Sequence, residues 1–558
     1  MTAEQTEERP AAAAGSPRRV DVVVVGAGFA GLYALHRLRG LGLSVQVFEA
    51  GSGVGGTWFW NRYPGARCDV ESIEYSYSFS PELEQEWEWS ERYPSQPEIL
   101  RYIDHVADRF DLRRDIQLDT RVTAATYDEA GGRWTVITDR GDEVSAQFCI
   151  LATGCLSAAK RPEVAGLESF EGDWYHTGRW PHEGVDFGGR RVGVIGTGSS
   201  GIQSIPVIAE QAAHLVVFQR TPNFSLPARN RPLDPEAQAA VKASYPALRE
   251  RARRSYAGIA VPAPSKSALA VDPDERRRRY EAAWEAGGLM SMTTTFADLI
   301  VDKSANDTAA DFIRSKIREI VADPDVAEAL TPTDHPFGTK RPCLDSGYFE
   351  TFNRDNVTLV DLRRTPIVEI VPSGVRTTHA VHELDSLVFA TGFDAMTGAV
   401  LRIDVRGRGG SLLREKWAAG PRTYLGLATA GFPNLFIVTG PGSPSVLSNM
   451  VVSIEQHVDW IADCISFLRA KGIGAIEATV ESEDAWVDHV NELANGTLFP
   501  TANSWYVGAN VPGKPRVFMP YVGGLPIYRA TCDEVTADGY RGFSLTGTPD
   551  AEGPHRPA

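Results

Sequence analysis

Residues 21–31 read DVVVVGAGFAG, in which four valines lead directly into the spacing GxGxxG, made by Gly26, Gly28 and Gly31. The valines predict a buried parallel strand, and residues 32–38 predict the helix that follows. In such a turn the first glycine permits the tight bend, the second lets a pyrophosphate approach the backbone, and the third lets helix and strand pack closely. The free N–H groups at the helix N-terminus favour the anion. The segment therefore predicts a dinucleotide-binding unit.

An acidic residue stands where such a unit needs one. Glu49 closes the next predicted strand, residues 45–48, at 23 positions after Gly26. A carboxylate at about 20 residues from the turn binds the ribose hydroxyls of a dinucleotide. Because its charge would repel a 2′-phosphate, this site suits FAD or NAD and disfavours NADP. A chance glycine loop is the simpler alternative, and the strand, helix and acid together argue against it.

The same pattern recurs in residues 191–201, which read RVGVIGTGSSG. Counting 23 positions from Gly196 leads to Gln219, with Arg220 beside it, and not to an acid. Because a guanidinium binds a 2′-phosphate through charge-assisted hydrogen bonds, we expect NADPH here. The alternative is an ordinary surface arginine. The other residues expected to contact this dinucleotide are Thr197, Gly198, Ser199, Ser200, Gly201 and Thr221.

The 558 residues carry a formal net charge of −16, with 43% hydrophobic and 23% charged residues. This composition is typical of a globular protein with more than one domain. Its acidity disfavours nucleic acid and membrane surfaces as partners, and no apolar run is long enough to cross a membrane.

The six cysteines lack a CxxC pair, which disfavours a metal site and suits a reducing compartment. We expect a cytoplasmic monomer or weak homodimer.

Strand and helix patterns continue along the chain. From about residue 234 to residue 323, Arg- and Glu-rich stretches alternate with apolar ones, which predicts a helical insertion. Residues 1–19 favour a disordered tail over a signal peptide. The predicted fold class is α/β, with two Rossmann-like dinucleotide-binding domains and the insertion. Further strands are expected at residues 134–138, 148–151, 357–362 and 384–390, and an amphipathic helix at residues 453–468.

Between the two glycine turns, residues 170–181 read FEGDWYHTGRWP. This segment resembles the FxGxxxHxxxWP fingerprint of Baeyer–Villiger monooxygenases. Its fixed positions are filled by Phe170, Gly172, His176, Trp180 and Pro181. Further segments resemble the phenylacetone and steroid monooxygenase branch of that family, and the resemblance extends from about residue 20 to residue 545. These segments are residues 53–72, 338–341, 390–394 and 440–450.

The resemblance implies how the chain is divided. A discontinuous FAD-binding domain would comprise residues 20–155 and 391–545. An NADP-binding domain, residues 156–225 and 331–390, would lie between these parts and be interrupted by the insertion at residues 226–330. Residues 1–19 and 546–558 would be loose tails.

The resemblance also implies a reaction. NADPH would reduce FAD, the flavin would capture O2 as a C4a-peroxide, and this would oxidise a ketone to an ester or lactone. Arg341 matches the family's catalytic arginine, whose permanent charge suits a negatively charged oxygen. Asp69 matches the carboxylate that orients the arginine, and its alternative role is a loop cap.

Other residues carry expectations from the same resemblance. Lys340 would bind the coenzyme phosphate beside Arg220, and Arg67 would lie near the nicotinamide. Trp505 would pack on the bound NADP or, alternatively, only in the core. His176 would couple domain movement to cofactor binding, with a purely structural role as an equal alternative. The residues expected to line the flavin are Gly56, Thr57, Trp58 and Tyr75, and those on the substrate side are Met450 and residues 443–449.

Three rival functions remain at this point. A flavin N- or S-oxygenating monooxygenase would share both glycine turns, but its close relatives lack the final Trp-Pro of the fingerprint. A flavin disulfide reductase needs a redox cysteine pair, and none is suitably spaced. A nucleotide-binding sensor would have no use for residues 338–341 beside two complete dinucleotide sites. The sequence therefore favours ketone oxidation.

Overall fold

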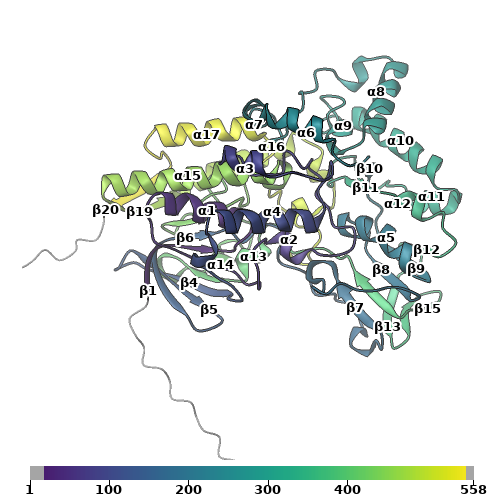
Figure 1. The fold of residues 1–558 in the computed structure, drawn as a ribbon, viewed down its shortest axis with the longest axis horizontal. Coiled ribbons are helices and arrows are strands. Elements are labelled where there is room, and N and C mark those ends of the chain that lie inside the picture. The colour runs from purple at the N-terminus through teal and green to yellow at the C-terminus, as the bar shows by residue number, and fades with distance from the viewer. Residues whose placement is uncertain (1–17, 548–558) are drawn as a thin grey trace, which may run out of the picture.

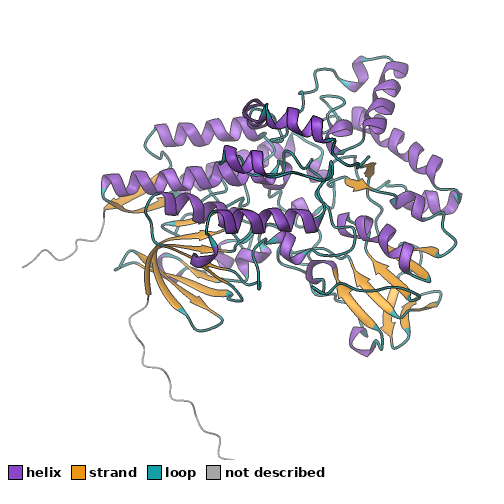
Figure 2. Cartoon of the chain, in the orientation of Figure 1, coloured by secondary structure: helices purple, strands orange, loops and turns teal. Residues whose placement is uncertain are grey.

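The computed structural model describes residues 18–547 and arranges them as two α/β units (Figure 1). Figure 2 shows the strands gathered in two places along the lower side of the view, with helices above and between them. The main sheets are separate, one built around each glycine turn. The expected α/β class with two Rossmann-like units is confirmed.

The first unit contains an eight-stranded sheet with the order β17-β4-β5-β6-β1-β2-β3, and β18 also pairs with β6. Strand β1 is central and parallel to both β2 and β6, and its residues Val22, Val23 and Val24 are fully buried. Burial on both faces explains the uninterrupted valine run. The strands are β1 (Arg18–Val25), β2 (Val45–Phe48), β3 (Ile116–Gln117), β4 (Val122–Asp128), β5 (Arg133–Thr138), β6 (Glu143–Leu151), β17 (Asp404–Arg406) and β18 (Leu435–Ile437).

Helices from both ends of the chain cover this sheet. Helix α1 begins directly after the first glycine turn and packs against α15, the longest helix, which lies beside it in Figure 1. Residues far apart in sequence therefore build one core. The helices are α1 (Phe29–Gly40), α2 (Thr57–Trp60), α3 (Pro81–Glu86), α4 (Gln96–Arg109), α13 (Gly398–Leu401), α14 (Leu413–Lys416), α15 (Met450–Lys471), α16 (Val480–Asn495) and α17 (Leu525–Ala537).

The second unit contains a five-stranded parallel sheet with the order β12-β9-β8-β16-β7. All its strands run the same way, so their carboxyl ends meet at one edge. In such a sheet ligands bind at that edge. The elements are β7 (Asp173–His176), β8 (Arg191–Ile195), α5 (Ser199–Gln211), β9 (His214–Gln219), α12 (Tyr348–Thr351), β12 (Val357–Asp361) and β16 (Ser386–Phe389), with a small antiparallel sheet of β13 (Ile367–Val371), β14 (Gly374–Thr377) and β15 (Val381–Glu383).

Between β9 and β12 the chain forms mainly helices, which lie at the upper right of Figure 1. The short strands at the two ends of this region pair in parallel and close it off. Its elements are β10 (Ser225–Pro227), α6 (Pro235–Lys242), α7 (Tyr245–Arg253), α8 (Pro273–Ala286), α9 (Leu289–Thr293), α10 (Lys303–Ile320), α11 (Pro324–Leu330) and β11 (Cys343–Asp345).

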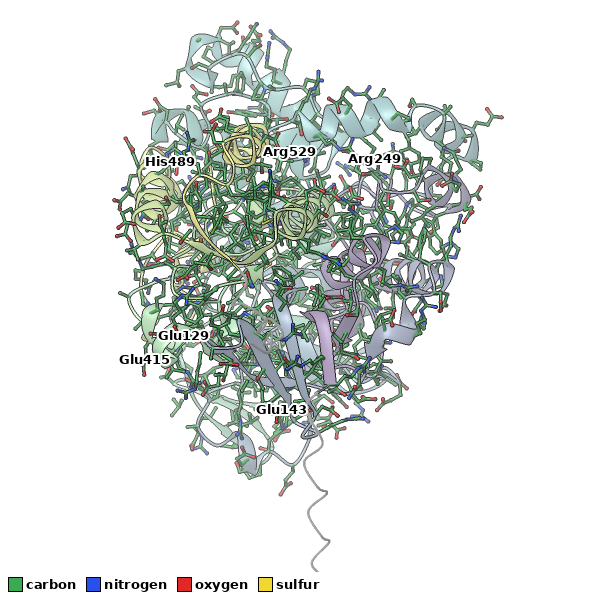
Figure 3. The ribbon with its side chains drawn as sticks, turned by 90° about the vertical axis from the view of Figure 1, so that its left-hand side faces the viewer. Glu129, Glu143, Arg249, Glu415, His489 and Arg529 are labelled. Carbon is green, nitrogen blue, oxygen red and sulfur yellow. The ribbon has the colours of Figure 1, made fainter. Side chains whose placement is uncertain are left out.

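This helical region packs on both units. Residues of α8 to α11 belong to the hydrophobic cluster of the second sheet, whereas Ile259 belongs to that of the first. The Arg249 guanidinium of α7 donates to the Glu84 carboxylate of α3 at 2.7 Å, with both side chains buried. Figure 3 labels Arg249 where these helices meet those of the first unit. The insertion therefore ties the two units together.

Both segments expected to be loose tails overlap a strand of the structure. Arg18 and Arg19 were expected in the N-terminal tail, but they pair with Val144 and Ser145 of β6 as part of β1. At the other end, Thr546 and Gly547 pair with β19 (Ile473–Ala478) as part of β20 (Phe543–Gly547). In each case main-chain pairing extends the strand into polar sequence. The rest of the expected tails, residues 1–17 and 548–558, lies outside the described residues.

Candidate active site

The first glycine turn is closed by contacts that exclude side chains. Gly26 has φ +106°, and a Cβ there would lie 2.6 Å from the Ala152 carbonyl oxygen. A Cβ on Gly31 would lie 1.8 Å from the Gly26 oxygen, and one on Gly28 would lie 3.3 Å from Gly56 Cα. Gly26 and Gly31 are therefore required by the close approach of backbone, and Gly28 leaves little room for a side chain. The turn fits a pyrophosphate group at the start of α1.

Glu49 closes over this turn from the end of β2. Its two carboxylate oxygens accept hydrogen bonds from the Ala27 N–H at 2.7 Å and the Gly51 N–H at 2.8 Å. Burial raises the pKa of Glu49, and these N–H groups partly offset that effect. The acid lies beside the glycine turn, where a ribose would be recognised.

The residues expected to line a flavin are close to the same turn. Gly56 faces Gly28 and has φ +53°, and Thr57 begins α2 directly after it. The Trp58 indole N–H donates to the Tyr75 hydroxyl at 3.1 Å, and both side chains are buried. These aromatic groups form one wall of the site.

The second glycine turn repeats the geometry of the first. Gly196 has φ +112°, and a Cβ on Gly201 would lie 2.2 Å from the Gly196 oxygen. By contrast, a Cβ on Gly198 would meet nothing within 4 Å. The turn therefore has open space in front of its middle glycine, where a second dinucleotide would approach the backbone.

The hydroxyls around this turn have protein partners. Thr197 donates to the Thr221 carbonyl oxygen at 3.2 Å. The Ser199 hydroxyl lies 3.3 Å from the Cys343 sulfur, and the Ser200 hydroxyl lies 3.1 Å from the Thr177 hydroxyl. The two serines therefore link α5 to its neighbours.

The position equivalent to Glu49 is turned away from the second turn. Gln219 is buried, and its side-chain amide donates to the Ala329 carbonyl oxygen at 2.8 Å. The next residue, Arg220, is exposed and forms no ion pair within residues 18–547. Lys340 reaches Asp334, with Nζ 3.3 Å from a carboxylate oxygen. Arg220, at the end of β9, is therefore able to bind an anionic ligand.

Arg341 and Asp69 meet where the two units adjoin. Arg341 Nε and Nη2 donate to the two oxygens of Asp69 at 2.6 and 2.8 Å, and Nη1 donates to the Val446 carbonyl oxygen at 2.7 Å. The Asn223 side-chain amide donates to the Arg341 carbonyl oxygen at 3.0 Å. The guanidinium is therefore fixed between the first unit and the segment expected on the substrate side.

Burial and charge act in opposite directions on this pair. Burial would raise the pKa of Asp69, but the Arg341 guanidinium outweighs it and lowers that pKa below its usual value. Burial would likewise lower the pKa of Arg341, and the Asp69 carboxylate raises it above its ordinary value. Both groups therefore stay charged at neutral pH.

A hydrophobic cluster surrounds the guanidinium. Tyr506 is buried beside it, and burial raises the pKa of Tyr506 to about 12, against the opposing influence of Arg341. Trp505 is partly buried in this cluster with Cys155 and Val446, at a ring distance of 4.3 Å from Tyr506. Val446 lies within the segment expected on the substrate side, residues 443–449. Tyr506 and Asn223 were not expected at the site, because neither stands in a recognisable pattern.

The fingerprint residues build the edge of the second sheet. His176 ends β7, and its Nδ1 accepts from the Gly178 N–H at 3.0 Å while Nε2 lies 3.4 Å from the Thr391 hydroxyl. Burial, with Arg179 and Lys160 nearby, lowers the pKa of His176 to about 4. Both ring nitrogens have partners, which supports the structural alternative. Trp180 is buried, and a Cβ on Gly172 would lie 2.4 Å from the Asp385 oxygen.

Arg67 has partners of its own in the first unit. Its Nη1 donates to Glu91 at 2.9 Å and to the Tyr93 carbonyl oxygen at 2.5 Å. Its carbonyl oxygen accepts from the Gln203 side chain of α5 at 3.1 Å. The segment around Arg67 therefore docks the first unit on the second.

Other chemistries find no support in residues 18–547. This part of the chain contains no group of three or more His, Cys, Asp or Glu residues arranged to hold a metal ion. All six cysteines are buried and form no disulfide with one another. No described helix has the length and apolar character required to cross a bilayer.

Two dinucleotide-binding turns, together with a partly buried arginine–aspartate pair, define a flavin- and nicotinamide-dependent oxidoreductase. Residues 23–244 match the family model of pyridine nucleotide-disulphide oxidoreductases. A Baeyer–Villiger monooxygenase of Pseudooceanicola batsensis is 47% identical over 523 residues, which cover 93% of this chain and 95% of that protein. A phenazine N-monooxygenase of Lysobacter antibioticus is 44% identical over 534 residues, covering 95% and 98%. The chain belongs to the Baeyer–Villiger monooxygenase family.

Solved structures agree with this membership. An oxidised steroid monooxygenase bound to NADP is 59% identical, with a TM-score of 0.91, and the match covers 95% of this chain and 99% of that one. OTEMO in complex with FAD and NADP is 42% identical, with a TM-score of 0.92 and coverage of 95% and 100%. The cofactors of this enzyme are FAD and NADPH, as expected from the two turns.

Proposed function

We propose that this enzyme oxidises ketones to esters or lactones with NADPH and O2, at a site centred on Arg341. The observation that supports it most is the fixed position of the guanidinium between Asp69 and the Val446 carbonyl oxygen. A partly buried cation that is already held in position stabilises negative charge on oxygen without reorganisation during the reaction. Family membership and the two glycine turns provide the cofactors for such a reaction.

The first turn is the proposed FAD site. Gly26, Gly28 and Gly31 would receive the pyrophosphate, and Glu49 would bind a ribose once its carboxylate leaves the Ala27 N–H. The remaining flavin-side residues are Gly56, Thr57, Trp58, Asp69 and Tyr75. When bound, the flavin accepts a hydride from NADPH and activates O2, while the protein supplies orientation and a dry, charged surrounding.

The second turn is the proposed NADPH site. The open space in front of Gly198 would receive the pyrophosphate, and Arg220 would bind the 2′-phosphate. Lys340 would also bind the 2′-phosphate, after breaking its contact with Asp334. Trp505 would pack against the bound coenzyme from the cluster around Tyr506.

Within this site Asp69 keeps Arg341 charged and oriented, and Asn223 holds the backbone of that arginine. The ketone would approach from the side of residues 443–449 and Met450, since Val446 contacts the guanidinium. Arg341 can then direct positive charge at the oxygen atoms that become negative as oxygen adds to the carbonyl carbon.

Oxidation of an aromatic nitrogen is the second candidate. It is favoured by the phenazine N-monooxygenase, whose 44% identity shows that family membership alone does not separate the two reactions. It would use the same cofactors, so the two candidates differ only in the atom that is oxidised.

A product assay distinguishes them. The FAD-loaded enzyme would be incubated with NADPH and separate panels of ketones and aromatic amines, and the products identified by mass spectrometry. The ketone panel includes linear, aromatic, cyclic and steroidal compounds, the last because of the 59% identity to a steroid monooxygenase. Addition of one oxygen to a ketone supports the proposal, whereas N-oxides without esters overturn it.

We also propose that the enzyme acts in the cytoplasm as a monomer or weak homodimer. The acidic net charge of −16 supports a freely dissolved protein without nucleic acid or membrane partners. Cell fractionation and light scattering over a range of concentrations test these two points.

A further inference from the structure

Lys160 lies near the second glycine turn and is not one of the residues assigned above to the proposed NADPH site. Its backbone N–H donates to the Gly392 carbonyl oxygen at 3.3 Å, and its neighbour Ala159 pairs with Phe393. Residues 390–392 directly follow β16, so Lys160 lies at the carboxyl edge of the second sheet. This is the edge at which the glycine turn also stands.

The order of the strands places Lys160 opposite Arg220 across the turn. Arg220 follows β9, the glycine turn follows β8, and Lys160 is bound to the end of β16, in the sequence β9-β8-β16. The ends of β9 and β16 are two strand spacings apart, which is about 10 Å. The open space in front of Gly198 therefore lies between two cations.

Lys160 and Arg220 are the two cations concerned. Within residues 18–547 no carboxylate forms an ion pair with Lys160 or Arg220. The nearby Asp394 is engaged by Lys514, with Nζ and carboxylate oxygen 2.6 Å apart. Burial, reinforced by Arg220, lowers the pKa of Lys160, and Glu163 and Asp394 offset this only in part, so a bound anion would stabilise the charged form.

The Lys160 ammonium group forms one hydrogen bond within the described residues. Lys160 Nζ donates to the Asn510 carbonyl oxygen, in the same loop as Trp505 and Tyr506. The Asn510 amide in turn donates to the Phe393 carbonyl oxygen at 2.7 Å. An ammonium has three donors, so Lys160 keeps others for a ligand while it holds this loop.

We propose that Lys160 binds the pyrophosphate of NADPH from the side opposite to the start of α5 and joins the coenzyme to the loop around Asn510. This inference rests on the proposed NADPH site. The pyrophosphate is the part concerned, because the 2′-phosphate belongs at Arg220 on the other side of the turn.

Coenzyme titrations of the FAD-loaded protein test the assignment without an activity measurement. NADP+, NAD+ and 2′-AMP serve as probes, because NAD+ has the pyrophosphate alone and 2′-AMP has the 2′-phosphate alone. Lys160→Met should weaken NADP+ and NAD+ by the same factor, about 10- to 100-fold, and leave 2′-AMP binding unchanged. Arg220→Ala should weaken NADP+ and 2′-AMP and leave NAD+ unchanged. Lys160→Arg should retain most of the affinity.

Arg179 provides a matched control, since it is an exposed cation at the same edge beside His176. An equal loss of affinity in Arg179→Met would overturn the proposal in favour of a general electrostatic effect. Unchanged NADP+ affinity in Lys160→Met, with faster amide exchange of residues 504–519 in the coenzyme-free protein, would also overturn it, because Lys160 would then only fix the loop. Either result leaves the proposed function intact if the wild-type enzyme still oxidises ketones with NADPH.

Discussion

Arg341 and Asp69 form a two-point ion pair, with both nitrogen–oxygen distances below 3 Å, although 272 residues separate them in the chain. Their charges are held at the junction of two units that each carry a glycine turn. A third contact to Val446 leaves the guanidinium in one orientation. This arrangement gives a permanent positive charge a fixed position between both proposed cofactors and the substrate side.

Replacing Arg341 by Ala should separate cofactor reduction from oxygen transfer. NADPH should still reduce the flavin, whereas ester formation should fall by at least about 10²- to 10³-fold, because the charge that stabilises negative oxygen is missing. Stopped-flow absorbance measures the first step and mass spectrometry the second. A normal ester yield from this variant would refute the role of Arg341.

Replacing Asp69 by Asn should destabilise the protein by roughly 1–3 kcal/mol, because it leaves the partly buried Arg341 guanidinium without its charged partner. Since the pKa of Asp69 is depressed in the folded state, its contribution is present above pH about 4 and is lost as pH falls further. Urea unfolding of wild type and variant should therefore give a constant difference between pH 5 and pH 8.

The control for the Asp69 substitution is a double-mutant cycle. Arg341→Met alone leaves a buried carboxylate, whereas the double variant removes both charges and should be less destabilised than the sum of the single variants. If the losses in free energy of unfolding are additive, Asp69 and Arg341 do not stabilise the protein through their interaction with each other.

The glycines of the second turn should respond oppositely to alanine. Gly201→Ala places a Cβ 2.2 Å from the Gly196 oxygen and should destabilise the fold by about 1–3 kcal/mol or more. Gly198→Ala has no neighbour within 4 Å and extended backbone angles, so it should fold normally yet lose NADP+ affinity. Thermal unfolding and coenzyme titration measure the two effects. Unimpaired NADP+ binding by Gly198→Ala would place the coenzyme elsewhere.

His176 should make stability depend on mildly acidic pH. Its folded pKa of about 4 lies below the usual value, so the unfolded chain takes up a proton first as pH falls from 6.5 towards 4. This should cost roughly 2 kcal/mol between pH 7 and pH 5. Urea unfolding should show a smaller pH dependence over this interval in His176→Asn than in wild type. An identical dependence in both proteins would show that His176 does not stay neutral.

The glycine turns, the acid at Glu49 and the cation at Arg220 could be read from the sequence because they are local. A strand, a tight turn and a helix place these residues at spacings that backbone geometry fixes. The periodicities located the predicted strands and helices but not their ends. Strand β6 begins at Glu143 and not at residue 148, and α15 extends three residues beyond the predicted helix at each end. Polar residues at positions 18–19 and 546–547 also extend strands by main-chain pairing.

Arg341 and Asp69 were identified by resemblance to a family and not by any spacing, because nothing local distinguishes them from other charged residues. Val446 was included only as part of the expected substrate-side segment, and no pattern indicated Tyr506 or Asn223. Likewise, no pattern could show that Gln219 turns towards Ala329, or that the insertion packs on both units.

The sequence by itself determined the class of this protein: two dinucleotide-binding units with opposite charge at the ribose, in a fold whose main strands and helices follow from hydrophobic periodicity. Only the tertiary structure decided which charges are paired: Asp69 engages Arg341 and Lys514 engages Asp394, while Lys160 and Arg220 have no carboxylate partner in residues 18–547. The physical reason is that pairing depends on distances of a few ångströms between segments hundreds of residues apart, and only the packing of the two units sets those distances.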